Sequence, residues 1–482
     1  MALPAHNWLE PIGRVPLQRL TSTADDDLPY HLKSFCATPR DQPLRAVNMA
    51  IETNIDARLK PRKPLKAKLE ELPQFPRSSN CCIYRVPQRL RQENEKAYAP
   101  QVVSIGPLHH GKQHLKSMEK EKQRYLKEFL ERTDAKLEDL LNLITEKEQQ
   151  LRSCYAEEIE FDREEFVEMI LVDATFIIEV LLRSQFRDLQ KQEDHIFERP
   201  FLIQDIWYEM WLLENQIPFF ILQDIFNLET ISELVKNWKP IIELTYEFFK
   251  SLEAVNGKLK KFENNNVEVK HFTDFIRTCH LPSVKSAPRP KKRKVVTAPS
   301  VIQLNQAGAK FKKSESNESF DITFTKGTLE IPQLKLQLET ESLFRNLIAF
   351  EQRHYVDNYI NDYVFIINHL CNTPKDVELL VREKIIENWL PDKKGASTLL
   401  NNLSKGTTLD YEKFYFLSLC EDLEDYCKKR YNMWRATLIQ NYFNTPWAIL
   451  SVIAAIFLIL LTIVQAVSSV IQVVSQPPHS SS

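Results

Sequence analysis

The charge-free stretch at residues 448–467, AILSVIAAIFLILLTIVQAV, limits the possible folds of this chain more than any other part of its sequence. As a helix, its 20 residues would be about 30 Å long, the thickness of a bilayer's hydrocarbon core. Thirteen of them are Leu, Ile, Val or Phe, so insertion is favourable by roughly a few kcal/mol. A buried core helix is the alternative, but core helices seldom run this long without a charge. Tyr442 and Trp447 add interfacial aromatics at the start of the stretch, and we predict a membrane-spanning helix.

The charges on either side of this helix indicate its orientation. Lys428, Lys429, Arg430 and Arg435 precede it, and no Lys or Arg follows it. The positive-inside rule then places the large N-terminal domain in the cytosol. The first residues also lack the basic start and apolar run of a secretory signal. We expect a single-pass, tail-anchored protein of the plasma membrane or an endomembrane.

An extracellular or luminal domain is the alternative orientation. In that case Asn317 and Asn402, which begin the sequons NES and NLS, would be acceptors for N-glycosylation. The eight cysteines are scattered apart from the adjacent Cys81 and Cys82. They are typical of reduced thiols in a cytosolic domain, which favours the first orientation.

Composition argues against several classes of function. The chain has 8 Gly and 26 Pro, and it contains neither GxGxxG nor the P-loop pattern GxxxxGK(S/T). The phosphate-binding loops of nucleotide enzymes are therefore not expected. A net charge of −2 gives no general reason to expect nucleic-acid binding.

Changes in composition along the chain suggest its organisation. Residues 1–76 carry ten prolines and no sustained apolar period, which is typical of a disordered arm. Residues 285–313 hold nine Lys or Arg and no acid. We predict a disordered Pro-rich arm (1–76), a helical N-terminal part (77–282), a basic linker or loop (283–319), a β unit with a helical C-terminal part (320–445), a transmembrane anchor (446–474) and a short tail (475–482).

Apolar periodicity predicts helices through most of the domain. One amphipathic helix begins at Gln113, with the segment EKEKQR (119–124) facing water, and a second covers about 135–157. In the next, Asp162 and Glu165 stand at capping-box spacing before a run that is apolar almost all round to residue 182. A second apolar run, 201–226, is interrupted at Pro218. We expect these two apolar segments to pack together.

Residues 320–338 instead alternate between apolar and polar side chains. The alternation turns near Lys326 and Gly327 and continues around Pro332, which indicates short antiparallel strands. The predicted fold class is therefore mainly α: a multi-helix globular domain with a small antiparallel β unit at about 320–338 and one C-terminal transmembrane helix.

Three histidines in SIGPLHHGKQHL, His109, His110 and His114, are a possible metal site. His110 and His114 have the i, i+4 spacing of a helical ligand pair. Gly106 and Gly111 make the first part of the segment a turn, so the pair need not share a helix face. We favour a structural turn whose histidines bind backbone groups.

Four acids, Asp173, Glu179, Glu209 and Glu214, lie within runs that should be buried, where an unpaired charge is costly. They must therefore have partners. The favoured candidates are ion pairs with Arg183, Arg345 or Arg353, and capping of loop amides by Glu214 and Asn215.

A carboxylate-bridged metal centre in a helical bundle would need Glu-x-x-His from two helices. Glu351 and His354 supply one instance, and no second occurs. We name no catalytic, cofactor-binding or metal-binding residue.

The segment PKKRKVV contains the basic cluster Lys291–Lys294, which resembles a monopartite nuclear import signal. A plain solvated loop is favoured, ahead of contact with anionic lipid or an acidic partner.

Seven segments, in order along the chain, resemble the plant domain-of-unknown-function 247 family. They are CCIYRVPQRLR, YAPQVVSIGPLHHG, EFVEMILVDATFIIEVLL, WLLENQIPFFIL, AGAKFKK, LFRNLIAFEQ and YFNTPWAILSVIAAIFLILLT. The resemblance covers residues 81 to 465 and implies a mainly helical plant protein with a C-terminal transmembrane helix and no established enzymatic activity. It also links some relatives to reproductive self-recognition, and it supplies no site residues.

Together these features predict a membrane-anchored plant protein that binds another protein in signalling or recognition, and not an enzyme. We expect the membrane and unknown proteins as partners, and no cofactor, nucleic acid or small-molecule substrate. The alternatives are an enzyme or metal-binding protein that uses the buried carboxylates, and a nuclear regulator that uses the basic cluster.

Overall fold

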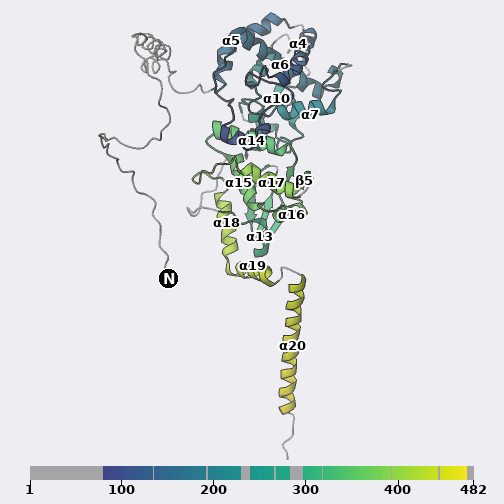
Figure 1. Cartoon of the computed structure of the whole chain (residues 1–482), viewed down its shortest axis with the longest axis vertical. Coiled ribbons are helices and arrows are strands. Elements are labelled where there is room, and N and C mark those ends of the chain that lie inside the picture. Colours follow the sequence, from purple (N-terminus) through teal and green to yellow (C-terminus); the bar gives the residue numbers. More distant parts are fainter. Residues whose placement is uncertain are drawn as a thin grey trace, which may run out of the picture. The chain divides into compact units, whose positions relative to one another are not determined.

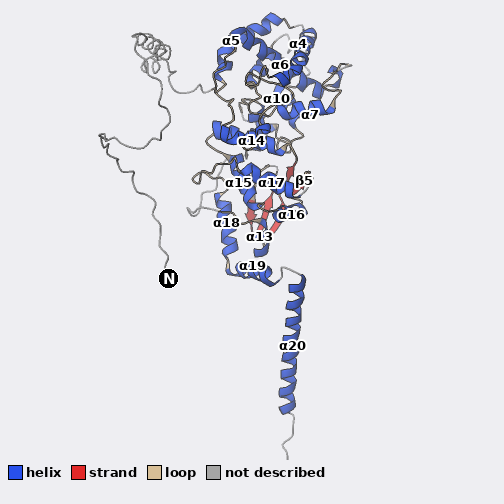
Figure 2. Cartoon of the chain, viewed as in Figure 1, coloured by secondary structure: helices blue, strands red, loops and turns tan. Residues whose placement is uncertain are grey.

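The computed structural model describes residues 80–133, 135–191, 194–228, 239–264, 267–282, 297–316, 318–391, 393–442 and 446–474. The chain divides after Phe75, and every described element belongs to the unit Pro76–Ser482. This part is mainly helical with two small sheets, which confirms the predicted fold class (Figures 1 and 2). The predicted arm, the short tail and the basic cluster lie outside the described residues.

Helix α6 (Arg163–Gln185) is the centre of the N-terminal part. The side chain of Asp162 accepts a hydrogen bond from the amide of Glu165, as the sequence predicts for an N-cap. Nearly every residue from Phe166 to Arg183 is buried. Helices α4 (Lys116–Thr133), α5 (Leu137–Ser153), α8 (Phe219–Phe226) and α10 (Ile241–Phe249) pack around α6. Figure 1 shows α4, α5 and α10 beside α6.

The second apolar run forms two helices with a long break between them. Helix α7 (Pro200–Glu209) ends well before Pro218, which precedes the first residue of α8. Residues 210–218 lie outside both helices, so the non-helical segment is longer than the interruption at Pro218 that the sequence predicts. It contains Glu214, Asn215 and Gln216, whose side chains bind backbone groups and so compete with helical hydrogen bonds.

Shorter helices complete the part before the sheets. They are α3 (Gln88–Arg91), η1 (Glu95–Ala97), η2 (Gln113–Leu115), η3 (Arg187–Leu189), α11 (Lys260–Asn264), α12 (Phe272–His280) and α13 (Val301–Ala307). Helix α13 has a full capping box from Ser300 and Gln303 and ends at Gly308 in the left-handed conformation.

The two sheets lie within the predicted β region and its neighbours. Strands β2 (Thr323–Thr325) and β3 (Thr328–Ile331) form the predicted antiparallel hairpin, whose turn has positive φ at Lys326 and Gly327. Strand β1 (Lys310–Lys313) pairs with β3 in parallel. Strand β4 (Leu334–Leu336) follows Pro332 and pairs in parallel with the distant β5 (Ile386–Asn388).

Apart from β5 and the connecting loops, the regular elements after β4 are helices. They are α14 (Thr340–His354), α15 (Tyr359–Leu370), α16 (Pro374–Arg382), α17 (Lys393–Ser404), α18 (Leu417–Lys428), α19 (Arg430–Tyr442) and α20 (Pro446–Val474). In α20, the segment Trp447–Gln472 has a mean hydropathy of 2.9 over its apolar window and is 0% buried. It is long and apolar enough to cross a membrane.

Residues 80–115, which precede α4, contain only the short helices α3, η1 and η2, joined by turns and irregular segments. Two of these turns use glycine at positive φ, 74° at Gly106 and 79° at Gly111. A Cβ atom at Gly106 would overlap the carbonyl oxygen of Gln216, whereas a Cβ atom at Gly111 would meet nothing within 4 Å.

We expect Gly106→Ala to destabilise the protein by several kcal/mol more than Gly111→Ala. Both substitutions incur the left-handed penalty of about 1–2 kcal/mol, but only the first forces a backbone shift in the loop 210–218. Urea unfolding of the full chain in detergent, followed by tryptophan fluorescence, measures the difference. Equal stability of the two variants would show that Gly106 does not approach Gln216 this closely.

Candidate functional site

A buried polar centre occupies the loop between α7 and α8. Glu214, Asn215 and Gln216 are consecutive and at most 1% exposed. The Asn215 side chain accepts a hydrogen bond from the amide of Ile105 (2.8 Å) and donates one to the carbonyl of Val103 (3.1 Å). It therefore binds an extended stretch of backbone much as a neighbouring strand would.

Glu214 holds another part of the same N-terminal segment. Its carboxylate accepts a hydrogen bond from the amide of Val86 (2.6 Å), pairs with Arg91, and lies 3.1 Å from His109 Nε2. Burial alone would raise the pKa of Glu214, but these contacts outweigh it and lower the pKa. The predicted capping of loop amides by Glu214 and Asn215 is thus present.

Gln216 connects the loop to the start of α12. Its side-chain amide donates to the carbonyls of Met210 (2.6 Å) and Leu212 (2.9 Å), and its oxygen accepts from the amide of Phe272 (3.0 Å). Three consecutive polar side chains therefore supply hydrogen bonds to three separate segments of the core.

Asp173 pairs with Lys122, which the sequence analysis placed on a water-facing segment. Both side chains are 0% exposed, and Lys122 Nζ lies 2.5 Å from Asp173 Oδ1. Asp173 also accepts from the amide of Gly106 (2.7 Å). Burial lowers the pKa of Lys122, but the carboxylates of Asp173 and Glu119 outweigh it, so the amine stays charged. The predicted exposure of Lys122 is wrong because the side chain crosses the α4–α6 interface to this partner.

Glu179 and Glu209 also have partners. Glu179 pairs with Arg132 and with the predicted Arg183, whose Nε lies 2.9 Å from it. Glu209 accepts hydrogen bonds from three consecutive backbone amides, those of residues 101, 102 and 103. Of the other two predicted arginines, Arg345 pairs with Glu341 instead and Arg353 is exposed.

Glu351 and His354 do not point to a common ligand. Glu351 pairs with Arg277 (3.0 Å) and caps the amides of Ile360 and Asn361. Burial raises the pKa of Glu351 to about 7. His354 contacts the hydroxyl of Tyr84 through Nδ1 (2.9 Å).

The histidine-rich segment forms the predicted turn and does not gather its side chains. His114 contacts the carbonyl of Pro100 (3.2 Å), and His110 packs edge-on against Phe161. His109 contacts Glu214 and Lys112, which are side-chain partners where backbone groups were expected. In the described part of the chain, no group of three His, Cys, Asp or Glu residues could hold a metal ion.

Two predicted features cannot be placed in full. The basic cluster at residues 291–294 and the acceptor Asn317 lie outside the described residues. Asn402 is described; it lies in α17 and is half-buried.

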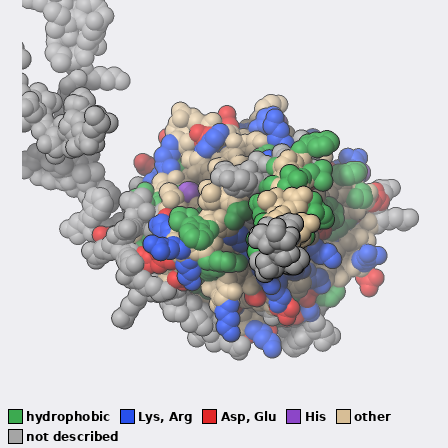
Figure 3. Space-filling view, turned by 90° about the horizontal axis from the view of Figure 1, so that it is seen from below, with side chains coloured by type: hydrophobic (Ala, Val, Ile, Leu, Met, Phe, Trp, Pro, Cys, Tyr) green, Lys and Arg blue, Asp and Glu red, His purple; other side chains and the backbone are tan. Residues whose placement is uncertain are grey.

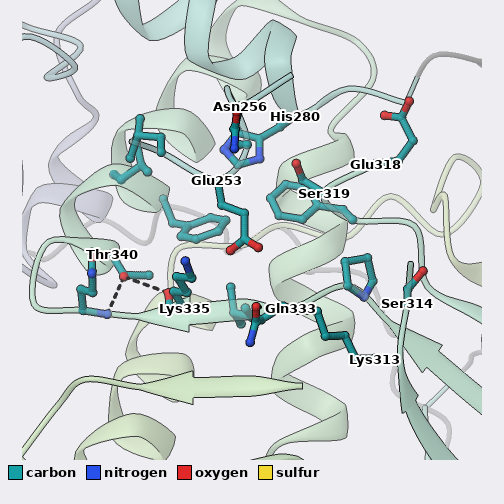
Figure 4. A pocket seen from close by; sticks show the side chains of 18 of the residues that line it. Glu253, Asn256, His280, Lys313, Ser314, Glu318, Ser319, Gln333, Lys335 and Thr340 are labelled. Atoms are coloured by element: carbon teal, nitrogen blue, oxygen red, sulfur yellow. Dashed lines mark hydrogen bonds between the residues drawn. The ribbon is translucent and has the colours of Figure 1, made fainter. Parts of the chain in front are cut away.

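A cleft of about 1020 Å³ lies between α12, the strand β4 and the start of α14, and no sequence motif indicated it. Figure 4 shows Glu253, Asn256 and His280 on one side and Gln333 and Lys335 on the other. Aromatic side chains line much of the remaining wall: Trp207, Tyr208, Trp211, Phe311, Phe320, Phe344 and Trp389.

His280 is the most unusual side chain of this cleft. It is 5% exposed, its ring stacks on Phe320 with centroids 4.5 Å apart, and neither ring nitrogen has a hydrogen-bond partner among the described residues. Burial, with Lys261 and Lys258 nearby, lowers the pKa of His280 to about 3. The neutral ring can donate one hydrogen bond and accept one, but it is a weak base for proton transfer near pH 7.

This cleft could not be predicted from a local motif, because its walls come from segments far apart in the chain. Trp207 and Trp211 stand at i, i+4 spacing, which is more typical of a core stripe. His280 ends an amphipathic helix, where a histidine is usually a favourable C-terminal charge.

Comparison with known proteins identifies relatives in plants. The sequence model of the family DUF247, described as "Plant protein of unknown function", matches residues 83–461. The UPF0481 protein At3g47200 of Arabidopsis thaliana is 31% identical over 422 residues, covering 81% of this chain and 87% of that protein. The Putative UPF0481 protein At3g02645 of the same plant is 23% identical over 502 residues, covering 85% and 93%. No solved structure matches.

We expect Asp173→Leu to destabilise the protein by about 3–5 kcal/mol, because it removes the fully buried partner of Lys122 and leaves that charge only the partly exposed Glu119. The double variant Asp173→Leu/Lys122→Met removes both charges. It should lose only about 1–3 kcal/mol, the cost of removing the partners of the Gly106 amide and the Ser104 carbonyl. Urea unfolding of the two variants and the wild type measures these losses. A single variant as stable as the wild type would contradict a structural ion pair.

Proposed function

This chain belongs to the DUF247 family of plant proteins of unknown function, and we propose that it is a membrane-anchored protein that binds another protein in signalling or recognition. The observation that carries the proposal is α20, whose apolar side chains are exposed along Trp447–Gln472. Such a surface is unfavourable in water and favourable in a bilayer. The helical domain before it is then displayed at a membrane.

The chemistry of the buried groups supports binding more than catalysis. The acids singled out in the sequence are paired with cations or backbone amides, and those amides belong to segments that need such partners to pack. A cleft whose histidine has a pKa of about 3 offers shape, aromatic surface and hydrogen bonds, and little proton transfer. For the process we propose reproductive self-recognition, to which the family resemblance links some relatives.

Membrane attachment is tested by changing Leu458 and Ile459 to Arg. Each central Arg costs roughly 2.5–3.5 kcal/mol of insertion energy, so the double variant should move from the alkaline-carbonate pellet to the supernatant. The matched control Leu458→Phe/Ile459→Phe keeps the segment apolar and should stay in the pellet.

The wild type, the Phe control and the Arg variant also test whether the protein binds a partner at the membrane. Proximity labelling from the N-terminus in plant cells, followed by direct binding of purified candidates, should identify a protein that is labelled by the wild type and the Phe control and lost with the Arg variant. Carbonate retention of the Arg variant would exclude this anchor, and the absence of any direct binder among the candidates would contradict a recognition role. Nuclear accumulation of the Arg variant would instead favour the basic cluster as an import signal.

We propose that the large domain faces the cytosol, because basic residues precede α20 and none follows it. A C-terminal extension carrying Asn-Gly-Thr should then be glycosylated, while Asn317 and Asn402 stay unmodified. The measurement is a gel shift of plant-expressed protein on glycosidase treatment. A shift without the extension that disappears in Asn317→Gln/Asn402→Gln would place the domain in the lumen or outside the cell.

A further inference from the structure

Helix α19 exposes an apolar stripe immediately before the candidate membrane helix. Tyr431, Trp434 and Leu438 are 76%, 68% and 47% exposed. Their spacing of three and four residues places them on one face of the helix, while Met433, which is 48% exposed, lies on another face. Large apolar side chains seldom gather on a water-exposed face without a partner.

The packing of α19 keeps this stripe outward. Asn432 is buried, and its side-chain amide donates to the carbonyl of Tyr426 (2.8 Å). The guanidinium of Arg435 lies so close to Gly308, the left-handed residue after α13, that a Cβ atom there would overlap it. These contacts fix the rotation of α19 against the body, so the stripe cannot turn inward.

The charged residues from Lys428 to the start of α20 are all basic, although Lys428 pairs with Glu424 of α18 (2.6 Å). Residues 428–446 include Lys428, Lys429, Arg430 and Arg435 and no acid. Figure 3, viewed from the side of α20, shows hydrophobic side chains on this face, with both basic and acidic side chains around them. Aromatic and aliphatic residues flanked by basic residues are the composition of helices that lie in the interface of a bilayer with anionic lipids.

The chain position of α19 also favours the bilayer over a protein partner. Helix α19 contacts α20, and only residues 443–445 separate the two helices. If α20 spans a membrane, α19 is therefore held close to the headgroups of that same membrane.

We propose that α19 is an interfacial helix: Tyr431, Trp434 and Leu438 lie at the boundary between headgroups and acyl chains, and Lys429 and Arg430 face anionic phosphates. This rests on the proposed membrane anchor. It adds a second contact with the bilayer, so the body is held against the membrane and not on a free tether.

The test uses full-length protein reconstituted in vesicles of phosphatidylcholine and phosphatidylserine. The reporter is an environment-sensitive fluorophore on a single introduced cysteine, in a background with Cys36→Ser and Cys427→Ser; the other six native cysteines are buried. It is placed in turn by Trp434→Cys, by the matched exposed aromatic Trp389→Cys on the body, and by Leu458→Cys within α20. Lipids brominated near the headgroup or deep in the chain act as quenchers.

We expect the label at position 434 to show blue-shifted emission and stronger quenching by shallow than by deep bromines. The label at 389 should be unquenched, and the label at 458 should be quenched by deep bromines. If the label at 458 is quenched, but the label at 434 is unquenched and its emission indicates a polar environment, the interfacial helix is overturned and the anchor stands. If the label at 434 has blue-shifted emission but is unquenched, protein covers the stripe, and this result also overturns the interfacial helix. An unquenched 458 overturns the anchor itself.

Discussion

The hydrogen bonds that Glu214, Asn215 and Gln216 make to backbone groups are the interaction on which the rest of the domain depends. The segment between residues 80 and 115 has few regular elements, so many of its amides lack partners within their own helix or strand. Buried amides without partners are costly. The loop supplies partners for Val86 and Ile105 and, through Gln216, for the first residue of α12. One short loop therefore allows an irregular segment to pack against the helical core.

The sequence predicted those parts of the fold that follow from local pattern. The cap at Asp162, the all-round apolar helix after it, the turn around Gly106 and Gly111, and the hairpin at Lys326 and Gly327 depend on neighbouring residues, and each is present. Strands β1 and β5 could not be predicted from the sequence, because they are short and pair with strands that do not follow them directly in the chain. The same limit applies to the acids: burial could be inferred from their runs, but Lys122 as the partner of Asp173 depends on how α4 packs on α6.

Of the functional features, one could be predicted from the local sequence, and two depend on how the chain packs. A candidate membrane helix is visible from composition alone, since 20 residues without a charge are rare in soluble domains. The cleft around His280 and the exposed stripe of α19 depend on which side chains the packing leaves uncovered. Of these, α19 links the anchor to the body through its contacts with α13, and the cleft presents aromatic and polar groups. The buried polar framework is thus distinct from the surfaces that we propose to contact the membrane and a protein partner.

Hydrogen exchange of the full chain in detergent is the most direct measurement of the central claim, that the loop 214–216 fixes the N-terminal segment to the core. The amides of Val86, Ile105 and Phe272 are hydrogen-bonded to side chains that are at most 1% exposed. They should therefore exchange as slowly as those in the middle of α6. Mass spectrometry of peptides that cover these residues gives the rates. Rapid exchange of Val86 and Ile105 beside a protected α6 would show that the segment is not held by this loop, and would contradict the account.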